Sequence, residues 1–461
     1  MSDRLRQGRY HSDSEDYNRY EQELLAVEGI AAAYAQDLAE ASRRTRSKVR
    51  AGMRSERALI EVSAGVATPL LVSYVTWLLA RAQNEGVDRL YFLARDGQIL
   101  HLIAEAVAPS LRVDVELHYL QASRVTLNLA AATDLTDDTL PWLLTGLRRQ
   151  SMVSLCERLH VNPSELSGAL ERHGLSPKRW DVALGKEGAA RMRAVLREPE
   201  QREILRRRAG EVRARTLPYL NSTGFLDPGD VGIVDLGGAG SQLHALGAIR
   251  EQAALNRPTG YLVYRERSTV GDQDREGRIA GCSALHIWMT DNGDGSGGPL
   301  ATGVVAMLEA FCAADHGRVV DYVPGASAVD VVTEEHYGAA VRRWGLPTVR
   351  AAMASAVSEL VREGGPEPLD AHLLTFLSAN LETFIRRPTR AEACAWGRFP
   401  VGAGRLEDTT VLAPRLTFRD LSSALCIGQS VSSLSRWWPG SLARTPRYLR
   451  ALLACVAWLR R

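Results

Sequence analysis

The sequence predicts an α/β protein with an open, mainly parallel sheet, a large helical insertion and a helical C-terminal region. Short apolar runs at 87–93, 113–120 and 229–236 are each followed by a polar loop. Helix-like apolar stretches at 99–104 and 243–249 follow two of these loops. Strands that alternate with helices are typical of a parallel sheet, whose ligands bind along the carboxyl ends of the strands.

The length and composition of the chain limit the number of domains and the kinds of partner that can be expected. The chain has 461 residues, of which 45% are hydrophobic, so it can bury a large core in one or two domains. Its formal net charge is only +2, which gives no electrostatic reason to expect nucleic acid as a partner. A homo-oligomer is compatible with the composition.

The cysteines and the first residues indicate a cytoplasmic protein. Six cysteines occur without a Cys-x-x-Cys pair, which favours buried thiols over a disulfide framework or a zinc site. Residues 1–20 are polar and lack the apolar centre of a signal peptide, so we expect a flexible tail there. The basic cluster at 43–48 is interpreted as a solvated helix end.

We expect an α/β core domain at 21–330 and a mainly helical region at 331–461. Residues 62–82 are apolar but interrupted by serines, threonines and a proline, which favours a buried core helix over a membrane span of about 20 apolar residues. An insertion at about 134–222 has helical spacing almost throughout. Part of it, 152–175, has the length of a helix-turn-helix, but Glu157, Glu165 and Glu171 balance its basic residues, so a pocket-shaping insertion is favoured over a DNA-binding one.

The C-terminal stretch carries tryptophans and basic residues. Arg436-Trp437-Trp438 precedes an amphipathic run at 447–453. Docking of the tryptophans on the core is the favoured interpretation, while peripheral membrane contact and a platform for a sugar ring remain alternatives.

The loop after the third apolar run has the composition of a phosphate-binding loop. Asp235 stands near the end of the run, and small residues lead into the next helix: Gly237, Gly238, Ala239, Gly240, Ser241 and Gln242. Glycines allow close approach of an anion, and a helix N-terminus offers free N–H groups. Asp235 is suited to hold a sugar hydroxyl or a metal ion. The alternative is an ordinary tight turn of any α/β protein.

Two other strand ends carry polar residues of the same kind. Arg95, Asp96 and Gly97 follow the first run, and Ser123 and Arg124 follow the second. We expect them to converge with Asp235 and Ser241 along one edge of the sheet. Taken alone, Arg-Asp-Gly is equally compatible with a capped turn.

The glycine-rich loop resembles three known kinds of loop. A methyltransferase loop needs glycines where Ala239 and Ser241 stand, and a sugar-kinase or actin-like loop needs a second copy that the sequence lacks. The loop is also similar to that of type I phosphoribosyltransferases, with Asp235 as the second acid and Gly240 as the turn glycine. Val234 replaces the first acid of that motif and Ala239 its threonine. In the same comparison, residues 95–97 resemble the pyrophosphate loop.

A second resemblance is to a bacterial family described as predicted haloacid-dehalogenase-type hydrolases of surface-polysaccharide clusters. It is carried by Leu-Tyr-Phe-Leu-Ala-Arg-Asp-Gly-Gln at 90–98, by 119–124 and by Val-Asp-Leu-Gly-Gly-Ala-Gly-Ser-Gln at 234–242, with fainter matches at 308–311 and 316–317. That chemistry needs a nucleophilic carboxylate two residues before the second aspartate. If Asp96 is the second aspartate, Ala94 occupies the nucleophile position.

The phosphoribosyltransferase resemblance implies transfer of 5-phosphoribose from phosphoribosyl pyrophosphate (PRPP) to a small polar acceptor, for which the hydroxyl of an aminoglycoside or another specialised metabolite is one class. It implies that Asp96 accepts the acceptor's proton and that Asp235 holds the ribose hydroxyls and Mg²⁺. Arg95, Arg124 and the loop amides would face the phosphates. Glu309, His244 and His316 are weaker candidates. A haloacid-dehalogenase-type phosphatase and a non-catalytic sugar-phosphate-binding module in glycan assembly are the alternatives.

Overall fold

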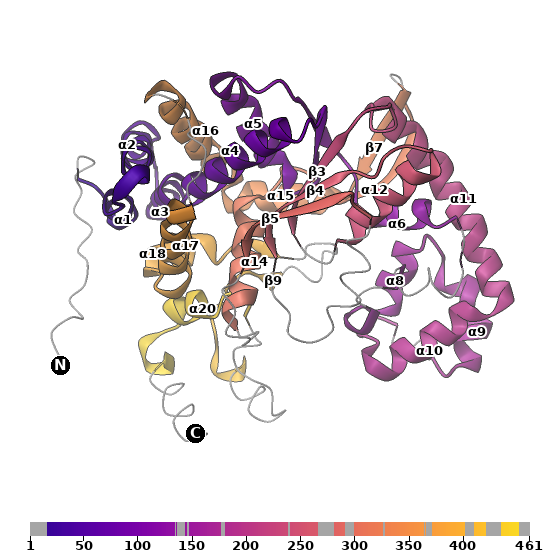
Figure 1. Ribbon diagram of the computed structural model, residues 1–461. Helices are drawn as coiled ribbons and strands as arrows, with labels where there is room; N and C mark the ends of the chain where they lie inside the picture. Colours follow the sequence, from indigo (N-terminus) through magenta and orange to yellow (C-terminus); the bar gives the residue numbers. More distant parts are fainter. Residues whose placement is uncertain are drawn as a thin grey trace.

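The structure is a computed structural model with a five-stranded parallel sheet at its centre (Figure 1). It describes residues 16–133, 135, 143–144, 147–176, 180–237, 240–265, 281–290, 299–325, 328–363, 365, 371–401, 410–420 and 435–450. The strands are β1 (Arg89–Leu93), β2 (Glu116–Leu120), β3 (Val231–Gly237), β4 (Thr259–Arg265) and β5 (Ala284–Thr290). The α/β class with an open parallel sheet is confirmed.

The strand order places β1 and β3 side by side at the middle of the sheet. The order is β2-β1-β3-β4-β5, and Phe92 of β1 lies opposite Val234 of β3. The chain leaves β1 toward β2 on one side and leaves β3 toward β4 on the other. Connections diverge in opposite directions at this point, which is where open α/β sheets leave a crevice for a ligand.

Helices cover both faces of the sheet because alternate side chains of the buried strands point to opposite faces. Leu90, Phe92 and Val234 belong to one core, together with α4 (Thr68–Asn84), α5 (Gly97–Leu111), α14 (Pro299–Phe311), α16 (Leu346–Glu363) and α17 (Ala371–Arg386). Tyr91 and Ile233 belong to the other, together with α6 (Arg124–Ala131), α11 (Pro199–Ser222) and α12 (Ser241–Gln252).

The expected core helix lies in a continuous helical stretch. This stretch consists of α3 (Arg54–Val62), a π-helical turn, η2 (Ser63–Ala67), and α4. By length and composition Arg54–Asn84 is able to cross a membrane, but the apolar part of the stretch is completely buried inside the protein. Tyr74 of α4 donates a hydrogen bond to the backbone oxygen of Tyr261 in β4, which ties the helix to the sheet.

The first described residues are already part of the packed structure. α1 (Arg19–Leu25) begins within the range assigned to a tail, and its Tyr20 is buried. The short helix η1 (Gly29–Ala31) and α2 (Ala32–Lys48) follow. Residues 1–15 lie outside the described residues.

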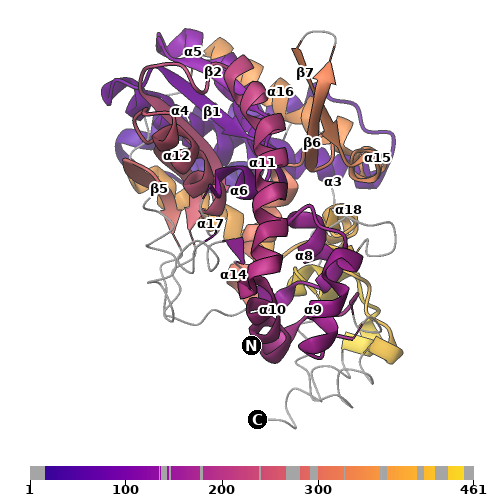
Figure 2. The same cartoon turned by 90° about the vertical axis from the view of Figure 1, so that its right-hand side faces the viewer.

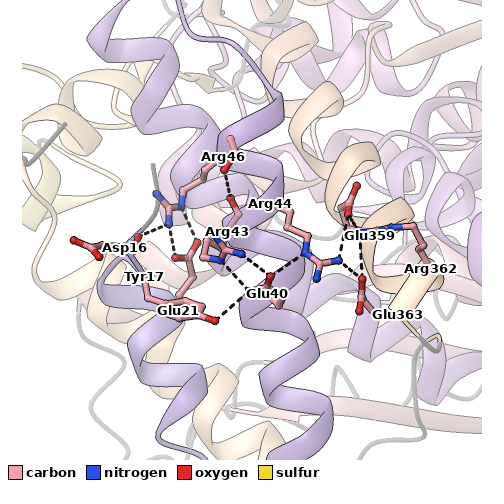
Figure 3. A network of polar contacts seen from close by, with 11 residues as sticks. Asp16, Tyr17, Glu21, Glu40, Arg43, Arg44, Arg46, Glu359, Arg362 and Glu363 are labelled. Carbon is pink, nitrogen blue, oxygen red and sulfur yellow. Dashed lines mark hydrogen bonds and ion pairs between the residues drawn. The ribbon is translucent and has the colours of Figure 1, made fainter. Parts of the chain in front are cut away.

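The basic cluster at 43–48 is a network of ion pairs rather than a solvated helix end (Figure 3). Arg46 pairs with Glu21 of α1 at 2.6 Å, and its side chain is only 6% exposed. Arg44 pairs with Glu40 of its own helix and with Glu363 of α16. The solvated interpretation was wrong because it considered one helix alone, whereas carboxylates of α1 and α16 pack against these guanidiniums.

The insertion between β2 and β3 is helical in its described part. It contains η3 (Leu147–Arg149), α8 (Met152–Arg158), η4 (Pro163–Leu166), α9 (Ser167–Arg172), α10 (Gly185–Arg197) and the long α11. Figure 2 shows α11 running from the sheet layer to the group formed by α8, α9 and α10.

The remaining elements follow the sheet in sequence. They are the antiparallel pair β6 (Val319–Gly325) and β7 (Ala328–Thr333), then α15 (Glu335–Trp344), α16, α17, α18 (Arg390–Trp396), the short pair β8 (Pro400–Val401) and β9 (Thr410–Val411), and α20 (Trp438–Arg444). The C-terminal region is therefore mainly helical in its described part. Trp437 is buried and its indole N–H donates to the Ile385 backbone oxygen at 2.8 Å, so this tryptophan docks on the core. Membrane contact by the run at 447–453 stays a prediction, since 451–461 lie outside the described residues.

Candidate functional site

The loop after β1 is held tightly against the end of its own strand. A Cβ atom on Gly97 would lie 2.7 Å from the backbone carbon of Phe92, so only glycine allows α5 to begin this close to the strand. The Ala94–Arg95 peptide bond is cis. Asp96 stands at the N-cap position of α5, but its carboxylate does not cap the helix and forms no hydrogen bond with the described residues.

The loop after β3 has two glycines with positive φ. Gly237 has φ +146°, and a Cβ there would lie 2.2 Å from the Tyr264 backbone oxygen. Gly240, with φ +68°, is the N-cap residue of α12, and the space around its Cα is open. Asp235 is 9% exposed, and its carboxylate accepts hydrogen bonds from the Leu236 and Gly237 amides. The predicted loop residues Gly238 and Ala239 lie outside the described residues.

The two loops border a first cavity of about 280 Å³, which we call the loop chamber. Its walls come from the end of β3, the start of α12, the end of β4, the start of α6 and α14. It is lined by Asp96, Arg124, Asp235, Leu236, Gly237, Gly240, Ser241, Gln242, Tyr264, Arg265, Val305, Leu308 and Glu309.

A second cavity of about 280 Å³, the arginine chamber, lies on the other side of Asp96 and Arg124. It adds Arg95 and Ser123 from the strand ends, Gln150, Ser154 and Arg158 from the insertion, and Arg318, Tyr337 and Phe399 from later in the chain. The two chambers share Asp96, Arg124, Gln242 and Glu309. Residues from three strand ends that are far apart in sequence therefore meet along one edge of the sheet.

The shared acids are difficult to ionise because protein surrounds them. Burial, followed by the nearby Glu309 carboxyl, raises the pKa of Asp96 to about 8. Burial likewise raises the pKa of Asp235 to about 6, although its two backbone hydrogen bonds oppose the shift. Burial also raises the pKa of Glu309. Near neutral pH the site therefore carries less negative charge than three carboxylates suggest.

The two arginines at the strand ends, Arg95 and Arg124, differ in their contacts with the rest of the protein. The Arg95 guanidinium lies over the ring of Tyr337, 3.9 Å from its centroid. Arg124 is exposed at the start of α6 and forms no hydrogen bond or ion pair with any residue that the structure describes. Such a guanidinium is available to an anion that enters either chamber.

Some predicted residues serve the fold instead. The Ser123 hydroxyl accepts a hydrogen bond from the Val125 amide and donates one to the Val319 backbone oxygen at 2.7 Å, so it caps the start of α6 and holds β6. Gly97 lies beneath the loop and lines neither chamber. His316 also lines neither chamber; it hydrogen-bonds Tyr119 at 2.6 Å, and burial lowers its pKa. His244 lines neither chamber.

Several lining residues were not predicted from the sequence. They include Gln150, Ser154, Arg158, Tyr264, Arg265, Arg318, Tyr337 and the segment 399–401. Arg158 follows Glu157 in a helical run and resembles an ordinary surface charge there. Arg158 lines the arginine chamber only because α8 packs next to the sheet edge.

The acids suit Mg²⁺ that enters with a ligand better than a metal held by protein alone. The described residues contain no group of three or more His, Cys, Asp or Glu that are placed to hold a metal. Mg²⁺ is commonly bound by one or two carboxylates together with substrate phosphates and water. Asp235 fits this pattern, with Asp96 as the second carboxylate of the loop chamber.

No protein-family model matches this chain, and no curated protein is similar to it. The function is therefore inferred from the loops and charged residues of the two chambers.

Proposed function

We propose that the protein is a phosphoribosyltransferase-like enzyme that transfers 5-phosphoribose from PRPP to a small polar acceptor. The observation that supports this most is the pair of adjoining chambers at the crossover between β1 and β3. PRPP carries a phosphate monoester at one end and a pyrophosphate at the other. It therefore needs two anion-binding regions with a place for a sugar between them.

The two ends of PRPP have different partners in this proposal. The 5-phosphate binds at the start of α12, where Gly240 and Ser241 precede free amides and the positive end of the helix dipole. The pyrophosphate binds to Arg95 and Arg124. Asp235 holds the ribose hydroxyls between them. Mg²⁺ bound by Asp235 and the substrate would neutralise part of the pyrophosphate charge.

The transfer exchanges one bond to C1 of the ribose for another. The acceptor hydroxyl gives its proton to the Asp96 carboxylate while its oxygen forms a bond to C1. The bond from C1 to the pyrophosphate oxygen breaks, and its electron pair leaves with pyrophosphate. The arginines favour this step because they face the group on which negative charge develops.

A hydrolase of the haloacid-dehalogenase type would need a carboxylate nucleophile at residue 94, and alanine stands there. A non-catalytic binding module would use the same chambers without turnover. The position of Asp96, an acid with a raised pKa, at the border of the two chambers favours an enzyme over such a module.

Isothermal titration with PRPP and Mg²⁺ tests the proposed function. We expect saturable binding to the wild-type chain and at least tenfold weaker binding to Asp235→Asn. Asp114→Asn, which changes an exposed acid away from both chambers, is the matched control and is expected to bind like the wild type. Absence of binding to the wild-type chain would refute the proposal. Binding without release of pyrophosphate in the presence of any acceptor tested would favour the binding module.

A further inference from the structure

A groove outside both chambers has the properties of a ligand site. It has a volume of about 820 Å³, within the range of small-molecule pockets, and lies between α5 and α16, which pack side by side (Figure 1). We call it the α5–α16 groove. None of its lining residues in the described part of the chain borders the loop chamber or the arginine chamber. Its ligand is therefore inferred from the groove alone.

The two helices run in the same direction, so the groove has two different ends. Gln98 and Arg350, near the starts of α5 and α16, are hydrogen-bonded to each other. Near the other ends of the helices, a Cβ atom on Gly365 would lie 3.2 Å from the Ser110 Oγ. On α16 the lining residues extend from Arg350 to Val361, a rise of about 16 Å along a helix. The groove is thus long enough for an extended alkyl chain that begins at Arg350.

The walls of the groove are apolar along most of its length. They include Ile99, Leu102, Ile103, Met353, Val357 and Val361. Leu102 is 48% exposed at the open side of the groove. An apolar ligand would remove these alkyl side chains from water, which is favourable.

Arg350, at the polar end of the groove, forms no ion pair with any residue that the structure describes. Its Nη2 atom donates to the Gln98 Oε1 at 2.8 Å and to the Ala313 backbone oxygen at 2.6 Å. Its Nε and Nη1 atoms form no hydrogen bond with the described residues. Burial lowers the pKa of Arg350. A half-buried guanidinium of this kind is stabilised by a carboxylate that binds its free nitrogens.

The acids of the groove leave this position to an anion. Asp315 is exposed, and its carboxylate accepts a hydrogen bond from the Gln98 side-chain amide at 2.8 Å. Glu105 is also exposed and lies 3.6 Å from the His101 Nδ1. Water screens these two acids more than it screens the half-buried Arg350. The groove therefore combines apolar walls with a cation at one end.

We propose that the α5–α16 groove is a binding site for an apolar monocarboxylate with the chemistry of a medium-chain fatty acid. Its carboxylate binds the Nε and Nη1 atoms of Arg350, and its alkyl chain lies between Ile103 of α5 and Val357 of α16. The site is independent of the proposed function, because the groove shares no lining residue with the chambers assigned to PRPP. A cationic amphiphile is disfavoured, because its head group would meet the Arg350 guanidinium.

Titration calorimetry with four small probes tests the chemistry of the ligand. Octanoate, 1-octanol and octylammonium share an alkyl chain and differ in charge, whereas acetate has the carboxylate without the chain. We expect octanoate to bind at millimolar concentration or tighter. The other three should bind at least tenfold more weakly, because each lacks either the charge-assisted hydrogen bonds or the buried chain. No binding of octanoate, or binding of another probe within tenfold of it, would overturn the inference.

A bulky side chain in the groove locates the bound octanoate. Ala354→Trp fills part of the groove from an exposed position of α16 and is expected to weaken octanoate binding at least tenfold. Ala351→Trp makes the same change at an exposed position of α16 outside the groove and is the matched control. Octanoate binding that survives Ala354→Trp, or that both variants weaken equally, would contradict the inference.

Replacing Arg350 by glutamine tests the head-group contact. We expect Arg350→Gln to bind octanoate no more tightly than it binds 1-octanol, because the carboxylate loses its cationic partner. Octanoate binding as tight as that of the wild type would show that Arg350 is not the partner and would overturn the assignment. Arg350 also holds the Ala313 backbone oxygen, so the Ala354→Trp variant, which removes no hydrogen bond, decides the matter if Arg350→Gln does not fold.

Discussion

Replacing Asp96 by asparagine is expected to lower the rate of transfer by about 10²- to 10⁴-fold, the usual contribution of a general base. Asparagine keeps the size of the side chain but cannot accept the proton. Because the pKa of Asp96 is about 8, the wild-type kcat/KM should rise with pH up to this value as the carboxyl loses its proton. The variant should lack this rise. Initial rates measured between pH 6 and pH 9 would show it.

The same substitution is expected to stabilise the folded protein. A carboxyl whose pKa is raised from 3.8 in the reference state to about 8 in the fold holds a proton that the unfolded chain releases, so stability falls as the pH rises between these two values. Asparagine removes this loss. At pH 8 we expect the Tm of Asp96→Asn to exceed that of the wild type by about 2–4 °C. Asp114→Asn should change neither the Tm nor the pH profile, and a lower Tm for Asp96→Asn would contradict the burial argument.

Replacing Arg124 by methionine is expected to weaken binding of PRPP by about 10- to 100-fold, the equivalent of one charge-assisted hydrogen bond. Arg124 borders both chambers and has no hydrogen-bond partner in the described part of the fold, so its guanidinium is free to bind phosphate. For the same reason the free energy of unfolding should change little. Titration calorimetry measures the first effect and chemical denaturation the second.

The matched control for this substitution is Arg207→Met, which removes an exposed guanidinium from α11. It should leave PRPP binding unchanged. If Arg124→Met binds PRPP as the wild type does, or if both variants lose binding equally through a change of net charge, Arg124 is not a direct phosphate ligand.

The sequence was sufficient for the parts of the fold that depend on local pattern. The apolar runs that became β1, β2 and β3 are short, rich in β-branched or aromatic residues, and followed by polar loops, so their carboxyl ends could be predicted to converge. The buried helix at 68–84 was predictable as well, because its polar residues are few and small. The same features identified Asp96, Arg124 and Asp235 as candidate site residues, because each lies at or just after the carboxyl end of a predicted strand.

Other features of the fold and the site depend on contacts between segments that are far apart in sequence, which a local sequence pattern cannot predict. The strand β5 was not predicted because His286 interrupts its apolar run, in which only Trp288 and Met289 are buried. Arg46 was expected in solvent, but a carboxylate from another helix buries it. Arg158 and Arg318 reach the arginine chamber from α8 and from the start of β6, and sequence spacing gives no sign that these segments lie against the end of β1. The cationic lining of that chamber could therefore be found only from the structure.

A crystal structure of the chain with PRPP and Mg²⁺ tests most directly whether one PRPP molecule spans both chambers. We predict electron density for the 5-phosphate at the amides that follow Gly240, and for the pyrophosphate beside Arg95 and Arg124. Density confined to one chamber, or located away from the edge shared by β1 and β3, would contradict this prediction.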